Sequence, residues 1–381
     1  KRHCCREPPR VMSLLISCST YGNPFLKKVI HFVFLTTLVA PTILILVKRN
    51  KSLRMLKIGV AGAGHLGKIH IKILKELSSL YELVGFYDPN KAMAKEVELS
   101  FGVTSFETIQ GLIDNVDCLA VVTATLSHFE VAKCAIQARK HVFIEKPLTE
   151  TIEEAKKLQR LVQEADIIAQ VGHVERFNPG FLAALKHLDR PMFIETHRLA
   201  QFNPRGTDVP VVLDLMIHDL DIILSVVKSN VKKVSASGVS VISDSHDIAN
   251  ARVEFDNGCV ANITSSRISL KNMRKARFFQ RDAYISVDFL NKEVEVFEME
   301  DVKGEPDPFD LILDLGENKP KKKILIDKPD ITQTNAIQEE LICFHNCIIE
   351  HKQSPVPIDD GVAALELAHK ILGEMSKIYL K

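Results

Sequence analysis

A glycine-rich turn between a buried strand and a helix constrains the fold of this chain more than any other feature. The run Leu56–Ala61 is largely apolar and leads directly into GAGHLG at residues 62–67, after which apolar residues recur at helical spacing to about Ser79. In such a turn Gly62 permits the tight bend, Gly64 lets a phosphate approach the backbone, and Gly67 lets the helix pack on the strand. The N–H groups at the helix start attract phosphate. We therefore predict a dinucleotide-binding βαβ unit over residues 58–88, with His65 and Leu66 also in contact with the dinucleotide.

The residue at the end of the second strand indicates which dinucleotide is bound. Residues 82–87 read as a strand that ends at Asp88. A carboxylate there accepts hydrogen bonds from both adenosine ribose hydroxyls and repels a 2′-phosphate, so NAD is expected in preference to NADP. Lys91 lies close by and would weaken that preference. The alternative is that Asp88, followed by Pro89-Asn90, only starts a turn.

Strands and helices continue to alternate after this unit. Helical patterns cover residues 91–100, 108–114 and 127–138, and strand patterns cover residues 117–123 and 141–145. Strands separated by helices of this length predict a parallel, doubly wound sheet. Ligands on such sheets bind beyond the carboxyl ends of the strands. The polar residues expected there are Thr123, Thr125, His128, Glu145 and Lys146, of which all but Lys146 are assigned to the cofactor.

Length and composition limit the class of protein. The 381 residues exceed what one hydrophobic core usually serves, so we expect a nucleotide domain at 55–174 and a second domain at 175–381. The 49 basic and 48 acidic residues balance, which argues against a nucleic-acid partner. Eight cysteines without paired CxxC units fit a reducing cytoplasm.

The first 54 residues require a separate interpretation. Val29–Val47 is a mostly apolar run, flanked by Lys27-Lys28 and by a more basic segment at 48–54. Such a run is long enough to cross a membrane, and the charge distribution would keep the remainder in the cytoplasm. We favour the alternative that residues 1–54 are an over-extended reading frame or a non-native leader, because Met55 stands directly before the first strand. Either interpretation starts the folded protein near residue 55.

Five motifs in a fixed order resemble those of the glucose–fructose oxidoreductase / inositol dehydrogenase / MocA family. They are GAGHLG at 62–67, TATLSHFEVA at 123–132, EKP at 145–147, GHVERFNP at 172–179 and DLMIHDLD at 214–221. The resemblance covers the chain from Met55 onward. It implies an α/β protein in which a Rossmann domain precedes an α/β domain with a large, mostly antiparallel sheet, whose open face mediates homo-oligomers such as dimers or tetramers.

The sequence after residue 230 agrees independently with this implied architecture. Asp256-Asn257-Gly258 is a hairpin turn signal between two strand-like runs. The strand-like runs are 231–241, 247–255, 259–268, 276–280, 283–289 and 293–298, and the closing helices are 335–350 and 359–379. Residues 299–331 read as an excursion that contains a hairpin, with no function assigned.

The resemblance also implies the chemistry of an NAD-dependent dehydrogenase that acts on CH–OH groups. The lysine of EKP and the aspartate and histidine of the family's D-x-x-x-H motif match Lys146, Asp214 and His218. On a helix, residues at i and i+4 share a face. Removing a hydroxyl proton while a hydride leaves needs a base with a near-neutral pKa. We predict His218 as that base, Asp214 orienting it or sharing its proton, and Lys146 stabilising the developing alkoxide or joining a proton relay.

The sequence leaves open whether Lys146 or His218 takes the proton first. It predicts no metal site, because His218-Asp219 with Asp221 lacks a third ligand in a plausible arrangement.

Basic and polar residues near these motifs are candidates for substrate binding. In the family the GHVERFNP segment forms the hinge and borders the substrate, which implicates His173, Arg176 and Asn178. Arg176 is either a ligand for an anionic group or a bridge between the domains. Arg198, Arg205 and Arg267 are further candidates for binding an anionic substrate, each with a solvated surface arginine as the alternative.

The stretch before D-x-x-x-H departs from the family's usual glycine-rich run, since residues 206–212 read GTDVPVV. The variant resembles the branch that oxidises the 3-hydroxyl of nucleotide sugars such as UDP-N-acetylglucosamine, and arginines suit its diphosphate. The alternatives are a dehydrogenase of a free polyol or sugar, such as inositol or glucose, and a non-catalytic NAD-sensing regulator. The presence of Lys146, Asp214 and His218 together argues against a regulator.

Overall fold

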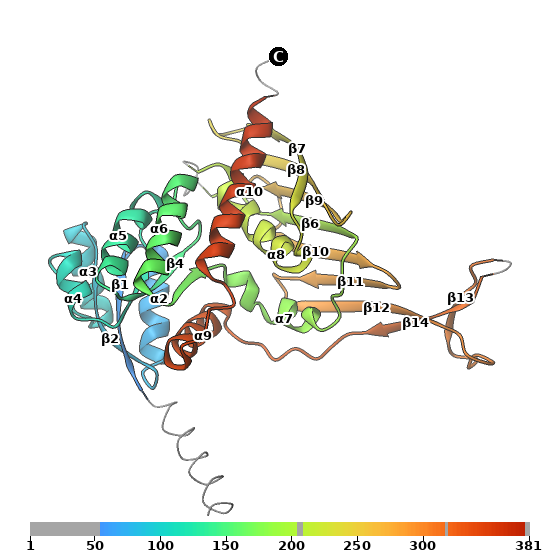
Figure 1. Ribbon diagram of the computed structural model, residues 1–381, viewed down its shortest axis with the longest axis horizontal. Helices are drawn as coiled ribbons and strands as arrows, with labels where there is room; N and C mark the ends of the chain where they lie inside the picture. The colour runs from blue at the N-terminus through green and yellow to red at the C-terminus, as the bar shows by residue number, and fades with distance from the viewer. Residues whose placement is uncertain (1–53, 204–208, 317–318, 378–381) are drawn as a thin grey trace, which may run out of the picture. The chain divides into compact units, whose positions relative to one another are not determined.

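The computed structural model describes residues 54–203, 209–316 and 319–377, which belong to one compact unit. They form two β-sheets with helices around and between them (Figure 1). The apolar run Val29–Val47 and the candidate Arg205 lie outside the described residues. Within the described ranges, no helix combines the length and apolar character needed to span a bilayer.

The first sheet is parallel and has the order β2-β1-β3-β4-β5. Alternate residues of β3 enter two different buried clusters, Leu119 and Val121 in one and Cys118 and Ala120 in the other, so the sheet is covered on both faces. This confirms the predicted doubly wound sheet. The strands are β1 (Leu56–Ala61), β2 (Tyr81–Tyr87), β3 (Cys118–Val121), β4 (His141–Glu145) and β5 (Ala169–Gly172).

Helices connect these strands and begin where the sequence supplies capping groups. Asn90 accepts hydrogen bonds from two backbone N–H groups of the helix that follows it, and Thr151 forms a capping box with Glu154. The helices are α2 (His65–Glu76), α3 (Lys91–Phe101), α4 (Ile109–Asp114), α5 (Thr125–Gln137) and α6 (Ile152–Ala165). Helices α2, α3, α5 and α6 each come directly after a strand in the chain. Their starts therefore lie beyond the carboxyl ends of the strands, where a ligand is expected.

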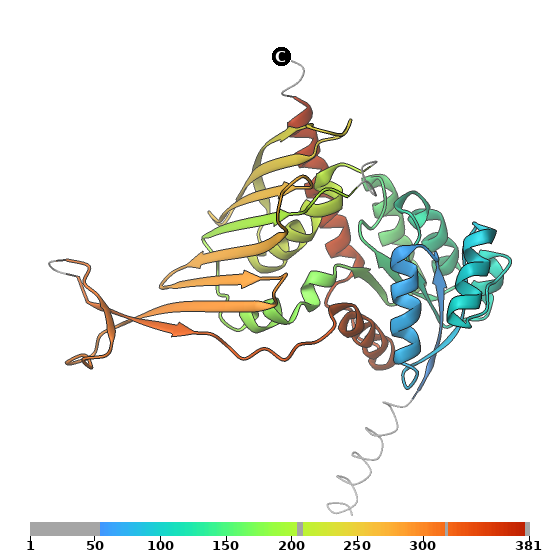
Figure 2. The ribbon, with the colours of Figure 1, turned by 180° about the vertical axis from the view of Figure 1, so that it is seen from behind.

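The second sheet has the order β13-β14-β12-β11-β10-β6-β9-β8-β7 among the described residues. Neighbouring strands are antiparallel except β6 and β9, which confirms the predicted mostly antiparallel sheet. The strands are β6 (Phe193–Leu199), β7 (Val231–Val239), β8 (Ile248–Phe255), β9 (Val260–Ser266), β10 (Met273–Gln280), β11 (Ala283–Asp288), β12 (Glu293–Asp301), β13 (Leu311–Leu313) and β14 (Lys322–Asp327). The hairpin expected within residues 299–331 is formed by β13 and β14, which extend beyond the rest of the sheet (Figure 2).

One face of the second sheet packs against helices, and the other face carries none of the helices drawn (Figures 1 and 2). The covering helices are α7 (Pro179–Leu185), α8 (Ile217–Val227) and α10 (Ile358–Ser376). Helix α10 also contacts α6 and β5 of the first half, so it joins the two sheets.

Helix α9 (Ala336–Glu350) follows the second sheet in sequence but completes the core of the first. Its residues Leu341, Phe344 and Ile348 share a buried cluster with Ile58 of β1. The Tyr81 hydroxyl donates a hydrogen bond to the backbone carbonyl of Leu341 at 2.8 Å. The two sheets are thus separated along the chain between Gly172 of β5 and Phe193 of β6, while α9 returns to the nucleotide-binding half.

Candidate active site

A cavity of about 740 Å³ lies beyond the carboxyl ends of β1, β2 and β3. It occupies the position that the glycine-rich turn predicts. Six of the predicted cofactor residues line it, namely Gly62, Gly64, His65, Leu66, Asp88 and Thr123. The further lining residues are Tyr87, Pro89, Met93, Ile109, Val122, Ala124, Leu126, Ser127, Glu130 and Val131. Met93 and Ile109 were not expected there, because isolated apolar residues on helices carry no sequence signal for ligand contact.

The three glycines meet different requirements, and together they fit a dinucleotide. Gly62 has φ of +98°, and a Cβ there would lie 2.5 Å from the carbonyl oxygen of Val122. A Cβ at Gly67 would collide with the carbonyl oxygen of Gly62, so the helix could not pack as it does. A Cβ at Gly64 would meet no other residue within 4 Å, although Gly64 lines the cavity. Space at that position is therefore left for a ligand, as the approach of a pyrophosphate requires.

Asp88 both shapes the turn and faces the cavity. Its carboxylate accepts hydrogen bonds from the backbone N–H of Ala63 and of Asn90, each at 2.8 Å. Lys91, whose charge was expected to weaken the preference for NAD, instead pairs with Glu107 at 2.8 Å. The lining described above includes the carboxylates of Asp88 and Glu130 but no lysine or arginine. A 2′-phosphate would thus meet carboxylates rather than cations, which fits NAD better than NADP.

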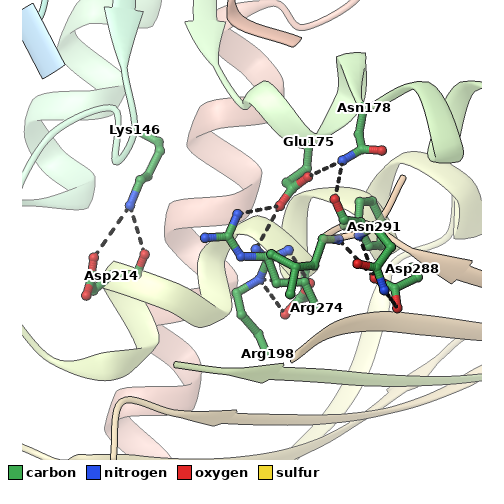
Figure 3. Close-up of polar contacts among 11 residues, drawn as sticks. Lys146, Glu175, Asn178, Arg198, Asp214, Arg274, Asp288 and Asn291 are labelled. Atoms are coloured by element: carbon green, nitrogen blue, oxygen red, sulfur yellow. Dashed lines mark hydrogen bonds and ion pairs between the residues drawn. The ribbon is translucent and has the colours of Figure 1, made fainter. Parts of the chain in front are cut away.

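Lys146 and Asp214 come together from the two halves of the fold. Lys146 follows β4, and its ammonium group donates a hydrogen bond to the backbone carbonyl of Asp214 at 2.8 Å. The same nitrogen lies 3.7 Å from Oδ1 of Asp214 (Figure 3). Both side chains keep some exposure, 18% for Lys146 and 38% for Asp214, so a substrate can reach them.

Asp214 lies in a π-helical turn, η2 (Val212–Met216), directly before α8, which carries His218. A π turn has more residues per turn than an α-helix, so residues four apart are not stacked as the α-helical spacing predicts. In the described ranges the Asp214 carboxylate has its contact with Lys146, and no hydrogen bond joins it to His218. The structure therefore pairs the aspartate with the lysine. Single-turn π segments frequently occur at functional sites.

Burial and neighbouring cations keep His218 neutral. Burial lowers the pKa of His218 well below its usual range, and the charges of Lys146 and Arg198 lower it further. Its Nδ1 atom is buried and has no hydrogen-bond partner in the described structure. Burial also lowers the pKa of Lys146, although Asp214 opposes that effect. A neutral imidazole can accept a proton, and a nearby ammonium can stabilise negative charge.

His173 is buried near this cluster. Burial lowers its pKa, and neither ring nitrogen has a partner among the described residues. The other GHVERFNP residues hold secondary-structure elements together. Arg176 donates from Nε to Asp221 of α8 at 2.8 Å and from its guanidinium to Asp360 of α10. Of the two interpretations of Arg176, this geometry is that of a bridge.

Asn178 and Arg198 are likewise occupied by protein groups. Asn178 caps α7 and donates to the backbone carbonyl of Phe289 at 2.9 Å. Arg198 is only 2% exposed, and its guanidinium donates to Asp219 and, at 2.8 Å, to Glu175. Arg267 is also buried, and it donates to the backbone carbonyl of Val209.

Four predicted cofactor residues are not among those that line the cavity, and one of them is Gly67, where α2 packs against the carbonyl of Gly62. His128 of α5 has both ring nitrogens against backbone carbonyls, Pro147 at 2.9 Å and Thr123 at 3.0 Å, and so ties together the loops after β4 and β3. Thr125 is the first residue of α5. Glu145 is buried and meets Nε2 of His70 at 2.9 Å. His70, three residues after Gly67, was not among the residues predicted from the sequence. It lies on the buried face of α2, and its helical spacing could have indicated that position.

Comparisons with known proteins agree with both halves of this architecture. Residues 56–173 match the model of an oxidoreductase family with an NAD-binding Rossmann fold, and residues 190–284 match the GFO/IDH/MocA C-terminal domain. The chain is 35% identical over 315 residues to UDP-N-acetylglucosamine 3-dehydrogenase from Acidithiobacillus ferrooxidans, which covers 81% of this chain and 92% of that protein. It is 29% identical to scyllo-inositol 2-dehydrogenase (NAD(+)) from Bacillus subtilis, over 55% of this chain and 67% of that one.

Solved structures show the same relationship. The structure of the Acidithiobacillus ferrooxidans enzyme, GnnA, matches with a TM-score of 0.75 and 31% identity, covering 84% of this chain and 98% of that one. A levoglucosan dehydrogenase solved with NADH shares the fold at 18% identity, with a TM-score of 0.71 over 85% of this chain and 98% of that one. The glycine-rich cavity, the EKP lysine and the family matches to both halves lead to one conclusion: the chain belongs to the Gfo/Idh/MocA family of NAD-dependent oxidoreductases.

Proposed function

We propose that this protein oxidises the 3-hydroxyl of a nucleotide sugar of the UDP-N-acetylglucosamine type, with NAD as the hydride acceptor. The observation that carries the proposal is the contact of Lys146 with Asp214 beside a neutral His218, in a chain with a NAD-type cavity. The relative that matches 92% of its own length is a UDP-N-acetylglucosamine 3-dehydrogenase, which supports this substrate class.

In the proposed reaction His218 takes the proton of the substrate hydroxyl. Its neutral state at physiological pH follows from burial and from the cations around it. Bound NAD would supply the nicotinamide that accepts the hydride from the carbon that carries this hydroxyl. Lys146 donates a hydrogen bond to the reacting oxygen and stabilises the negative charge that develops there as the proton leaves.

Asp214 acts through Lys146 in this scheme. The carbonyl of Asp214 fixes the ammonium group, and the carboxylate raises the pKa of Lys146 against the effect of burial. A charged lysine is needed to stabilise an alkoxide, so Asp214 keeps Lys146 in the active protonation state. His173 is buried, and the charge of Lys146 helps to lower its pKa.

The direct test is turnover with a panel of substrates. Protein incubated with NAD and UDP-N-acetylglucosamine, other nucleotide sugars, inositol or glucose should form NADH and a 3-keto product only with the nucleotide sugars. A keto product identified by mass spectrometry fixes the position of oxidation. Turnover of inositol or glucose alone would support a dehydrogenase of a free polyol or sugar. Tight NAD binding without turnover would support a non-catalytic NAD-sensing regulator.

We further propose that the protein is cytoplasmic and forms homo-oligomers through the outer face of the second sheet. Five cysteines in the described ranges are free, which fits a reducing compartment. A row of aromatic side chains crosses four strands on the outer face, with ring centroids 5.0–5.7 Å apart: Phe193, Phe279, Tyr284 and Phe297. Measuring the mass of the protein in solution, and again after Phe279→Glu, tests this face.

A further inference from the structure

Two arginines stand directly opposite each other on the second sheet. Arg198 of β6 and Arg274 of β10 are partners in the antiparallel ladder, so their side chains lie on the same face. On β10 that face also carries Ala276 and Phe278, which are completely buried. Like charges at directly opposed positions destabilise a pair of strands unless other groups compensate them. This arginine pair therefore requires an explanation.

The compensation of the two arginines is unequal. Arg198 is buried and donates to both Asp219 and Glu175. Oε2 of Glu175 accepts a further hydrogen bond from Asn178 at 3.0 Å. Arg274 has one ion-pair contact, 3.8 Å from Nη1 to Oε1 of Glu175, which is longer than a hydrogen bond.

The guanidinium of Arg274 makes no hydrogen bond to another residue in the described ranges, and its side chain is 51% exposed. Its donors are therefore free to bind a ligand, whereas those of Arg198 are taken by protein carboxylates. Figure 3 shows this difference, with Arg198 held between its partners and Arg274 beside Glu175.

Arg274 lies close enough to the reacting groups to affect them. Its charge acts on His218 and lowers the pKa of that imidazole together with Lys146 and Arg198. An anionic group held by Arg274 would therefore lie near the site of hydride transfer. A guanidinium presents two parallel N–H donors to a phosphate, a geometry that a lysine cannot provide.

We propose that Arg274 binds the diphosphate of the nucleotide-sugar substrate and so selects nucleotide sugars over free sugars. The inference rests on the proposed function, since it assigns the group that recognises the charged part of that substrate. Arg198 holds Glu175 and Asp219 in place beneath it and does not contact the ligand.

The experiment measures binding of UDP and of uridine to the NADH-bound protein by calorimetry, together with the kinetics of UDP-N-acetylglucosamine oxidation. Arg274→Gln should weaken UDP binding and raise the KM for the nucleotide sugar about tenfold or more, the value of a lost charge-assisted hydrogen bond. Uridine, which lacks phosphate, and NAD should bind as before. Arg274→Lys should recover only part of the loss, because it restores the charge but not the paired donors.

Arg277→Gln is the matched control. Arg277 lies on the same strand, three residues away and thus on the opposite face, where it pairs with Glu195 at 2.8 Å. It should leave UDP binding unchanged. Equal UDP affinity in Arg274→Gln and the wild type, an equal loss in Arg277→Gln, or no UDP binding by the wild type would overturn the inference. UDP binding that depends on Arg274, without turnover of UDP-N-acetylglucosamine, would uphold it while rejecting the proposed function.

Discussion

The ammonium group of Lys146 donates a hydrogen bond to the backbone carbonyl of Asp214 at 2.8 Å, which joins the end of β4 to the π-helical turn before α8. The contact links the nucleotide-binding sheet to the half of the fold that contains His218. It makes the position of the lysine depend on both halves.

Lys146→Met should lower kcat by about 10²–10³-fold, the usual effect of removing one group that stabilises an oxyanion. The KM for NAD should change little, because Lys146 is not among the residues that line the dinucleotide cavity. Steady-state kinetics with both substrates measures the two effects. Lys140→Met is the control, since Lys140 flanks the other end of β4 and also donates to a backbone carbonyl, that of Val116 at 2.7 Å. Similar losses in both variants would contradict the assignment.

The pH dependence of kcat/KM should show an acid limb below about pH 6.5, the ordinary pKa of histidine. The sign follows from the lowered pKa of His218, because the base stays unprotonated until the pH falls well below that value. Activity should therefore be nearly constant between about pH 6.5 and 8. His218→Asn should remove the limb along with most of the activity. An acid limb that persists unchanged in residual His218→Asn activity would assign the proton to another group.

Asp88→Ser should weaken NAD binding about tenfold and narrow the preference for NAD over NADP, because the carboxylate is the group expected at the ribose hydroxyls. Fluorescence titration of both reduced cofactors measures the change. Asp114→Ser, at the exposed end of α4, is the control for removing one negative charge from the same half. Unchanged affinity for both cofactors in Asp88→Ser would remove Asp88 from the cofactor site.

Glu340 of α9 should make the protein less stable as the pH rises. Burial raises the pKa of Glu340 well above its usual range, and Glu145 raises it further. Both carboxylate oxygens lack partners in the described structure, and His70 and Glu145 are the titratable groups beside it, with ligand atoms of all three within 4.8 Å. A carboxyl with a raised folded-state pKa contributes its full stabilisation below about pH 4.3, the unfolded-state pKa. It contributes progressively less as the pH rises above that value toward the folded-state pKa.

Glu340→Gln should therefore raise the free energy of unfolding by about 1–3 kcal/mol near pH 8 and by less near pH 5. Urea titrations at both pH values measure the difference. Glu339→Gln, the partly exposed neighbour, should show no such trend. A loss of stability in Glu340→Gln at both pH values, accompanied by the loss of a bound metal ion, would instead indicate that the three side chains ligate a cation.

Local features of the sequence predicted the nucleotide half well. The roles of Gly62, Gly64 and Gly67 follow from steric requirements within a few residues, and the cavity lies where they predict it. The partners of Arg176 could not be predicted, because Asp221 and Asp360 are 45 and 184 residues away in the chain. The pairing of Asp214 with Lys146 depends on a π turn that the helical spacing does not reveal.

The arginines show most clearly which properties of a site the sequence does not reveal. Arg198 and Arg274 look alike in the sequence, yet one is buried against two carboxylates and the other is half exposed. Only the register of β6 and β10, together with the position of Glu175, separates an arginine that holds the fold from one that can hold a ligand. Residue type indicated the chemistry, and tertiary contacts decided which residue can perform it.

The most direct test of the central proposal is the formation of NADH when the purified protein is mixed with NAD and UDP-N-acetylglucosamine. We expect NADH and an equimolar 3-keto nucleotide sugar, both formed far more slowly by Lys146→Met and His218→Asn and both formed at the wild-type rate by Lys140→Met. No NADH with any nucleotide sugar, from protein that binds NAD, would contradict the account.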